Sequence, residues 1–392
     1  MAAPGRQDGR PQAIRVTVVL MLAACIAVNP SLWTAQREYP PAPWLPLARL
    51  PAALDALAVP ALLTLLGLAL LPRPWAPWPF LGLAALLVLG DQARLQPWLY
   101  QGALFLGALA LARDPRRAAQ LVLALSYFWS GVSKMNPDFG PMALPWLLGA
   151  LRVDAASAVP TGWLLALGLA FGAIEALIGV ALLLPATRRV GMVAAVAMHL
   201  LVLAAIGPAG LGWNHVVWPW NLALIALVVI LFRGDVSQPR AILWARGWYP
   251  KLLVLLVGLM PALHQVGLWD AYLSFSLYSN NVDEAWLVAD ARAAARLGPA
   301  ARAVADVRPG GTHGVRFLSW AMREVGVPAY PERRAHLAVF RALCRQAPDP
   351  SGLHLLIVPR HPGWRARPAP EVHSCRGPVP KLLGYTFPWL SM

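Results

Sequence analysis

The sequence predicts an all-α polytopic membrane bundle of about eight to nine transmembrane helices, followed by a small C-terminal α+β extramembrane domain. Of its 392 residues, 58% are hydrophobic and only 13% are charged, and the mean hydropathy is +0.55. Apolar segments recur up to Trp269. Several of them are close in length to the roughly 20 residues that a helix needs to cross a bilayer. The remaining residues have the composition of a water-soluble module. We therefore expect a transmembrane domain over residues 1–269 and an extracytoplasmic domain over residues 270–392.

The apolar segments define the expected spans in chain order. The first, 14–30, lacks a clear signal-peptide cleavage site and is expected to remain as a span. The other spans long enough to cross are 52–71, 116–134, 161–184, 190–206, 215–232 and 252–269. Segments 78–91 and 98–113 are shorter and form either two tilted spans or one re-entrant pair. Segment 142–151 is too short to cross and is expected to lie at the interface.

The basic residues of the loops predict the orientation. With nine spans, 13 of them lie on the side of the amino-terminal tail and 5 on the opposite side. Lysine and arginine concentrate in cytoplasmic loops, so the amino terminus is expected in the cytoplasm of a bacterial-type inner membrane. The net charge of +15 does not indicate a nucleic-acid partner, because 15 of the 33 lysines and arginines lie after Trp269 and most of the others lie in short loops, where membrane orientation explains them. An odd number of spans places the C-terminal domain outside.

Helical patterning in the C-terminal domain covers residues 286–297, 314–325 and 331–344, and residues 353–358 have the pattern of a strand. Cys344 and Cys375 lie in this domain, whereas Cys25 lies alone in the first span. Outside the cytoplasm the two can form a disulfide. The alternative is two unpaired, partly buried thiols.

Residues 121–148 carry the chemistry that stands out most. Tyr127, Ser130 and Lys134 follow helical spacing and share one helix face. Asn136 precedes a proline, which ends the helix, and Asp138 follows within reach of the lysine. An ionisable residue at membrane depth is a functional candidate. Lys134 is alternatively an interfacial anchor that pairs with Asp138.

Glu175 and His199 are expected near mid-membrane, about 15 Å from the inner ends of their spans. A carboxylate at this depth must be neutral, paired or hydrated, and a structural hydrogen bond between helices is the simpler alternative to catalysis. For His199 the alternatives are a satisfied core histidine and a proton carrier.

The stretch 212–221 supplies further candidate ligand-binding residues. Its three tryptophans are typical of an aromatic belt at a membrane boundary. The candidates are Asn214, His215, Trp218 and Asn221. If the orientation is right, most polar residues of the spans lie in the outer half, and they predict an outward-opening polar pocket. No zinc-type cysteine spacing, other metal constellation or glycine-rich phosphate loop stands out.

The motif SYFWSGVSKMNPDF at 126–139 resembles the HTTM family, the membrane domain shared with vitamin K-dependent gamma-carboxylase, and more loosely the DoxX group. The matching residues are Tyr127, Phe128, Gly131, Lys134, Asn136 and Asp138. Residues 171–200 resemble the helix pair that follows in the family, and 269–281 and 327–334 resemble the tails of bacterial members. The resemblance implies that Lys134 inherits the role of the carboxylase lysine, a base that works with oxidised vitamin K hydroquinone. Two departures argue against peptidyl-glutamate carboxylation: Ser133 replaces one lysine of the family's pair, and the outer module is far shorter.

These observations predict an integral membrane protein whose pocket holds a lipophilic ligand such as a quinone, with redox or base chemistry at Lys134. Burial disfavours an ammonium ion and so makes a neutral amine available as a base. Two alternatives stay open. One is a carrier of a small solute or of protons that uses Glu175 and His199 as its relay. The other is a membrane scaffold whose outer domain binds a protein.

Overall fold

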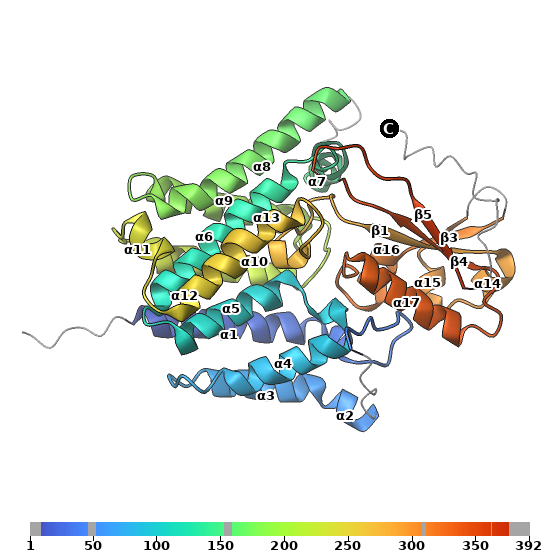
Figure 1. Ribbon diagram of the computed structural model, residues 1–392, viewed down its shortest axis with the longest axis horizontal. Helices are drawn as coiled ribbons and strands as arrows, with labels where there is room; N and C mark the ends of the chain where they lie inside the picture. Colours follow the sequence, from blue (N-terminus) through green and yellow to red (C-terminus); the bar gives the residue numbers. More distant parts are fainter. Residues whose placement is uncertain (1–8, 46–51, 153–158, 308–310, 362, 376–392) are drawn as a thin grey trace, which may run out of the picture.

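The computed structural model describes residues 9–45, 52–152, 159–307, 311–361 and 363–375. It shows a bundle of helices with a smaller sheet-containing part at one end (Figure 1). The helical part extends from α1 to α13, and the strands all come after it in the chain. The fold is therefore mostly helical, with a small antiparallel sheet at the C-terminus.

The helices follow the predicted apolar segments closely. The helices of the bundle are α1 (Arg10–Ala27), α2 (Ala52–Ala56), α3 (Ala58–Ala69), α4 (Trp78–Gly90), α5 (Pro97–Leu111), α6 (Pro115–Lys134), α7 (Leu144–Ala150), α8 (Thr161–Leu183), α9 (Arg188–Ile206), α10 (Val217–Phe232), α11 (Pro239–Leu243), α12 (Trp248–Leu253) and α13 (Met260–His264). A π-helical segment, Val254–Leu259, joins α12 to α13, and another, Phe139–Ala143, leads into α7. Both junctions lie beside prolines, which cannot donate the backbone hydrogen bond of a regular helix.

By length and composition, α1, α8 and α9 are long and apolar enough to cross a membrane. The other apolar helices of the described chain have 10 to 17 residues or, like α6, carry several charges at an end. A straight helix of 15 residues is only about 22 Å long, which is less than the roughly 30 Å hydrocarbon core. The described residues thus contain three helices of spanning length and several shorter apolar helices.

Helix α6 lies at the centre of the bundle. Its longest contact is with α8, and it also packs against α5, α10 and α12. Helix α1 packs against α3, α5 and α10 (Figure 1). Because its neighbours surround it, α6 is buried over most of its length and carries polar side chains that have partners on other helices.

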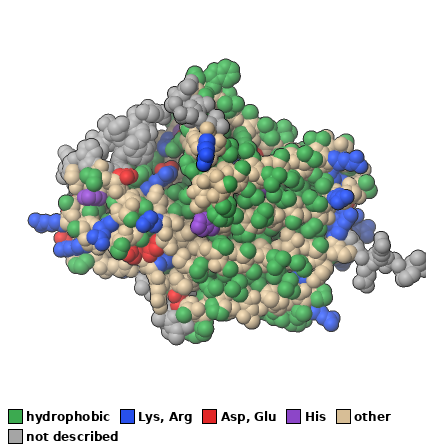
Figure 2. Space-filling view, turned by 180° about the vertical axis from the view of Figure 1, so that it is seen from behind, with side chains coloured by type: hydrophobic (Ala, Val, Ile, Leu, Met, Phe, Trp, Pro, Cys, Tyr) green, Lys and Arg blue, Asp and Glu red, His purple; other side chains and the backbone are tan. Residues whose placement is uncertain are grey.

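The surface of the bundle is apolar across its width. Figure 2 shows a broad hydrophobic face with lysine and arginine gathered at the far end of the helices and a mixed-charge surface on the C-terminal domain. Water-soluble proteins rarely expose an apolar surface of this extent. The distribution matches a lipid-facing belt between two polar ends.

The C-terminal domain contains a five-stranded antiparallel sheet with the order β2-β3-β1-β4-β5. The strands are β1 (Glu284–Ala289), β2 (Ala305–Val307), β3 (His313–Arg316), β4 (Leu353–Val358) and β5 (Glu371–Ser374). The central strand β1 pairs Leu287 with Val315 on one side and with Leu355 on the other. Helices α14 (Ala291–Ala295), α15 (Pro299–Arg302), α16 (Phe317–Glu324) and α17 (Arg333–Gln346) complete the domain (Figure 1).

Two predicted helices of this domain are wrong in their first three or four residues, which lie in strands. Residues 286–297 contain most of strand β1 and then the short helix α14, and residues 314–325 begin in strand β3. A short apolar run such as that of β1, which is buried in the middle of a sheet, lacks the alternation that distinguishes a strand from a helix. The strand predicted over 353–358 coincides with β4, and the helix predicted over 331–344 corresponds to α17.

A loop after α1 packs on the C-terminal domain, although it lies far away in the sequence. The backbone nitrogens of Glu38 and Tyr39 donate to the carboxylate of Glu324, and the ring of Tyr39 makes edge contacts with Phe317 and Trp320. The helical and C-terminal parts therefore share a packed interface.

Candidate functional site

Lys134 and Glu175 form a buried ion pair. The Nζ atom of Lys134, at the last position of α6, lies 2.8 Å from Oε2 of Glu175 on α8. The same ammonium donates to Oγ of Ser130 at 2.7 Å and contacts the Ser130 carbonyl at 3.3 Å. Lys134 is 8% exposed and Glu175 is 6% exposed. Removing charges from water is so costly that such a pair persists only where each charge meets an opposite one.

The pair exists because α6 and α8 approach each other unusually closely. A Cβ atom on Gly131 would collide with the backbone of Gly172 and Ala176, and one on Gly172 would collide with the Gly131 carbonyl. On α8, Gly168, Gly172 and Ala176 repeat every four residues and form a continuous strip of small residues. Such strips allow membrane helices to pack backbone to backbone.

Helical geometry places the charged residues beside this contact strip. On α6, Lys134 lies three positions after Gly131, and on α8 Glu175 lies three positions after Gly172, so both project to one flank of the strip. The two side chains therefore meet at the same height. The four-residue spacing of small residues on α8 is visible in the sequence. It could have predicted that α8 packs closely against another helix.

A second hydrogen-bonded chain crosses three helices. The Tyr127 hydroxyl lies 2.6 Å from Nε2 of His199 on α9, and Nδ1 of His199 lies 2.6 Å from Oδ1 of Asn221 on α10. The Asn221 amide nitrogen donates to the Val217 carbonyl, so its oxygen faces the histidine as an acceptor. Nδ1 therefore carries a hydrogen, and in a neutral ring Nε2 accepts the hydrogen bond of the Tyr127 hydroxyl.

The two groups of residues lie within one electrostatic environment. Tyr127 shares the α6 face of Lys134, and Glu175 interacts electrostatically with both Tyr127 and His199. All of these side chains are buried or nearly so. We call Tyr127, Ser130, Lys134, Glu175, His199 and Asn221 the acid–base cluster.

Gln101 extends the polar contacts to α5. Its amide nitrogen donates to Oγ of Ser126 at 2.9 Å, and its oxygen accepts from Nε1 of Trp220 at 2.8 Å. Ser126 precedes Tyr127, and Trp220 precedes Asn221, so this second connection lies next to the cluster in both helices. Gln101 and Ser126 were not among the candidate site residues.

Asn136 and Asp138 lie at the junction with the C-terminal domain. Asn136 accepts hydrogen bonds from the backbone nitrogens of Asp138 and Phe139 and donates to the Ser279 carbonyl at 2.8 Å. The Asp138 carboxylate binds the Arg367 guanidinium, and Nε2 of His361 lies 3.4 Å from it. Lys134 thus pairs with Glu175, whereas Asp138 holds the end of α6 to the domain.

Asn214, His215 and Trp218 shape the loop between α9 and α10. The Asn214 amide donates to the Tyr278 hydroxyl, and the Trp218 indole donates to the Ile206 and Trp213 carbonyls. The exposed ring of His215 contacts the Gly212 carbonyl and packs on Trp218. Of the four candidates in this stretch, only Asn221 belongs to the acid–base cluster.

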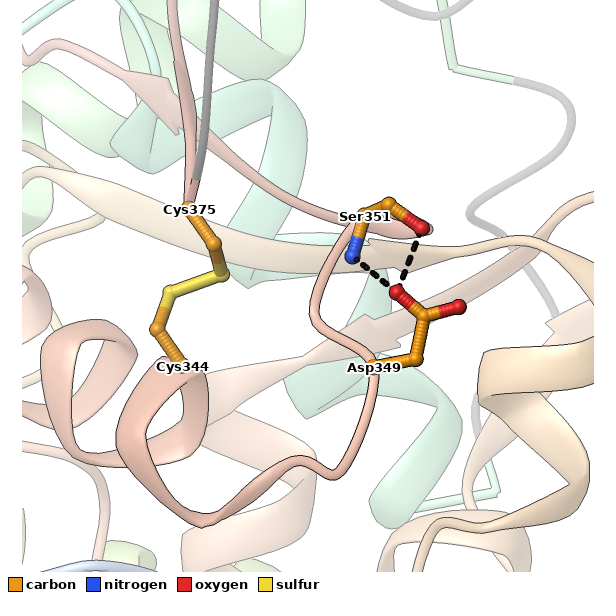
Figure 3. The surroundings of a disulfide bond; sticks show 4 residues. All are labelled: Cys344, Asp349, Ser351 and Cys375. Atoms are coloured by element: carbon orange, nitrogen blue, oxygen red, sulfur yellow. Dashed lines mark hydrogen bonds between the residues drawn. A yellow bond between two sulfur atoms is a disulfide. The ribbon is translucent and has the colours of Figure 1, made fainter.

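Cys344 and Cys375 are joined by a disulfide, with Cα atoms 5.5 Å apart (Figure 3). The bond connects α17 to the chain just after β5, whereas Cys25 is a buried free thiol. Within the residues that the structure describes, no group of three histidine, cysteine or acidic side chains is arranged to hold a metal ion. The side chains of the acid–base cluster itself can transfer and stabilise protons.

Comparisons with protein-family models, curated proteins and solved structures gave no match. The resemblance of residues 126–139 to the HTTM family accordingly stays a prediction.

Proposed function

We propose that this chain is an integral membrane protein of the HTTM and gamma-carboxylase-like type that performs acid–base chemistry on a lipophilic molecule such as a quinol. The observation that carries the proposal is the Lys134–Glu175 ion pair, which is buried between apolar helices. Membrane helices carry such groups rarely, and in most cases for a functional reason. A structural pair alone would not require the adjacent chain of Tyr127, His199 and Asn221.

The pair provides a base through an internal proton transfer. In a low-dielectric site the ammonium of Lys134 can pass a proton to the Glu175 carboxylate, which leaves a neutral amine and a neutral acid. The amine then accepts a proton from a hydroxyl of the substrate and becomes an ammonium again, while the substrate oxygen becomes an anion. About a tenth of each of the two side chains remains accessible, which leaves room for contact with one substrate atom.

The Tyr127–His199–Asn221 chain supplies the groups for onward proton movement. Neutral His199 accepts a proton at Nε2 while Asn221 fixes the ring through Nδ1. The Tyr127 hydroxyl contacts this ring, and the charge of Glu175 acts on Tyr127 through space. In the proposal, a proton leaves the carboxyl group towards α9 and α10 when Glu175 and Tyr127 come within hydrogen-bond distance.

The membrane arrangement that we propose has nine spans, a cytoplasmic amino terminus and an extracytoplasmic C-terminal domain. The 13-to-5 distribution of basic residues supports it, as does the gathering of basic side chains at the end of the bundle away from the domain (Figure 2). The Cys344–Cys375 disulfide also suits an oxidising compartment.

A carrier of protons or of a small solute is the second candidate. It is favoured by the position of Glu175, which interacts with Lys134 on one helix and with His199 on another. A relay of this kind transports protons without any bound organic substrate.

Variants of Lys134 separate the proposed base from an interfacial anchor. Lys134→Arg keeps the positive charge and length, but arginine stays protonated and cannot act as a base. We expect Lys134→Arg to accumulate in the membrane like wild type and yet to fail to restore the lipid-linked function that a deletion strain lacks, a failure that Lys134→Met shares. Lys251→Met serves as the control, because Lys251 is exposed on α12. Restoration of that function by Lys134→Arg would refute the base role.

Ligand extraction and transport assays separate the two candidate functions. Organic extracts of the purified protein are examined for quinones, and decylubiquinone is titrated into quinone-free protein. Stoichiometric binding that Lys134→Met weakens at least tenfold supports the enzyme. Proton flux into liposomes without a quinone, abolished by Glu175→Gln, would instead establish the carrier.

A further inference from the structure

An apolar groove lies on the other flank of the α6–α8 contact strip. It has a volume of about 580 Å³ and is lined by Val132, Met135, Leu169, Ala170, Ala173, Gln265 and Trp364. Ala173 lies two positions before Glu175, and Val132 two before Lys134. Two positions correspond to about 200° around a helix, so the groove opens away from the acid–base cluster. Its volume is within the roughly 300–1,000 Å³ typical of small-molecule sites.

The surroundings of the groove show that it opens towards lipid. The neighbouring α8 side chains Leu167, Ile174 and Leu177 are 50%, 59% and 62% exposed. Side chains of this kind form part of the broad apolar surface of the bundle and are stable only against hydrocarbon. A molecule in the groove therefore enters sideways from the bilayer.

One end of the groove is polar and reaches the C-terminal domain. Gln265 follows α13, and Trp364 comes from the loop between β4 and β5. The Trp364 side chain is 60% exposed, and the exposed residues Val266 and Leu268 accompany it. Tryptophan at the junction of an apolar surface and a polar domain is typical of the headgroup level of a membrane.

A basic residue, Arg365, lies next in the chain to the groove residue Trp364. It adjoins Trp364 in the chain and is exposed. The neighbouring Arg367 is bound to Asp138, but in the described ranges no carboxylate pairs with the guanidinium of Arg365. Arginine donors suit a phosphate group, and a positive side chain at the headgroup level attracts anionic lipids.

We propose that the groove binds one acyl chain of an anionic phospholipid, with its phosphate next to Arg365 and its glycerol region beside Trp364. A quinone would fill the apolar part but would leave the arginine without an anion. The lipid would hold the β4–β5 loop against the α6–α8 pair on the flank opposite the cluster. The inference does not depend on the proposed acid–base function, because it uses a different set of side chains.

Native mass spectrometry of the delipidated, detergent-purified full chain tests the assignment. The probes are phosphatidylglycerol and phosphatidylcholine with identical acyl chains. We expect wild-type protein to bind one phosphatidylglycerol tightly. Ala173→Trp fills the groove and should bind it at least tenfold more weakly. Leu177→Trp, the control, should bind it like wild type. Arg365→Gln should reduce the preference for phosphatidylglycerol about fivefold while phosphatidylcholine binding stays the same.

Photo-crosslinking of wild-type protein tests the same site without a variant. Phosphatidylglycerol with a diazirine in its acyl chain should label peptides that contain residues 132–135 and 169–173. Crosslinks confined to other helices would overturn the proposal, as would wild-type affinity in a folded Ala173→Trp variant. Displacement of the phospholipid by equimolar decylubiquinone would reassign the groove to a quinone.

Discussion

Gly131 on α6 and Gly172 on α8 face each other at the closest approach of the two helices. A Cβ atom on either residue would overlap backbone atoms of the other helix. Backbone cannot move aside as the end of a flexible side chain can, so any substituent here must separate the helices. The separation would also pull Lys134 away from Glu175, because both lie beside this contact.

Gly131→Ala should therefore lower the stability of the bundle by roughly 1–3 kcal/mol, the usual cost of overpacking a tight contact. Unfolding midpoints of the purified protein in detergent, measured by thermal scanning, provide the comparison. Gly162→Ala on α8 is the matched control, because no atom lies within 4 Å of its added methyl group. Equal midpoints for the two variants would show that the helices are not in contact at Gly131.

The ion pair itself predicts a strong coupling between two substitutions. Lys134→Met or Glu175→Gln alone leaves one buried charge without its partner, which costs about 3–5 kcal/mol. The double variant leaves no such charge and should be more stable than the sum of the two single effects implies. Free energies of unfolding of all four proteins close a double-mutant cycle. Additive effects would mean that the two side chains do not pair.

Much of the bundle could be predicted from the sequence, because the helices follow its apolar segments. The prediction succeeded where hydropathy is the dominant signal, as in α8 and α9. It left open the role of segments such as α4, whose 13 residues are apolar on all sides. For these, length alone does not distinguish crossing from re-entry.

The contacts of the cluster could be predicted only in part. The spacing of Tyr127, Ser130 and Lys134 placed them on one face, but the partner of the lysine depended on which helix packs there. Asp138 is closer in sequence than Glu175, yet it binds Arg367 of the C-terminal domain instead. Pairing between distant segments is set by packing, which a single hydropathy profile does not contain.

The Cys344–Cys375 bond predicts the thiol content of the protein. Because the chain has three cysteines, the denatured protein should bind one alkylating label without reductant, at Cys25, and three after reduction. Replacing both bonded cysteines by alanine should cost roughly 3–4 kcal/mol of stability in the C-terminal domain, from the closure of a 31-residue separation. Three labels without reductant would exclude the bond.

Reporter fusions test the proposed orientation. An enzyme active only in the cytoplasm should work when fused after Arg246, and one active only after export should work when fused after Gly298. The basis is the excess of basic residues on the side of the amino terminus. A cytoplasmic reporter that is active after Gly298 would place the C-terminal domain inside the cell and would remove the oxidising environment from the disulfide.

Glu332 predicts a pH dependence for the contact between the two parts of the molecule. Its Oε1 accepts a hydrogen bond of 2.8 Å from the backbone nitrogen of Ala271, just after the helical part. Burial and then the negative charge of Asp270 raise the pKa of Glu332 to about 7, although the hydrogen bond from Ala271 and the charges of Arg360 and Arg334 act in the opposite direction. The Asp270 carboxylate accepts a hydrogen bond from the Tyr330 hydroxyl and pairs with Arg334.

The pKa of Glu332 is higher in the folded protein than in the unfolded chain. Between these two pKa values, the folded protein therefore binds more protons at this carboxyl group than the unfolded chain does. The stability from Glu332 is therefore present at pH below about 4.5 and is lost as the pH rises to about 7 and beyond, by up to about 3 kcal/mol. Glu332→Gln imitates the protonated acid and keeps the hydrogen bond to Ala271. We expect the thermal midpoint of wild type to fall relative to Glu332→Gln between pH 5 and pH 8. Midpoints that change in parallel over this range would show that Glu332 is already ionised at pH 5 in the folded protein.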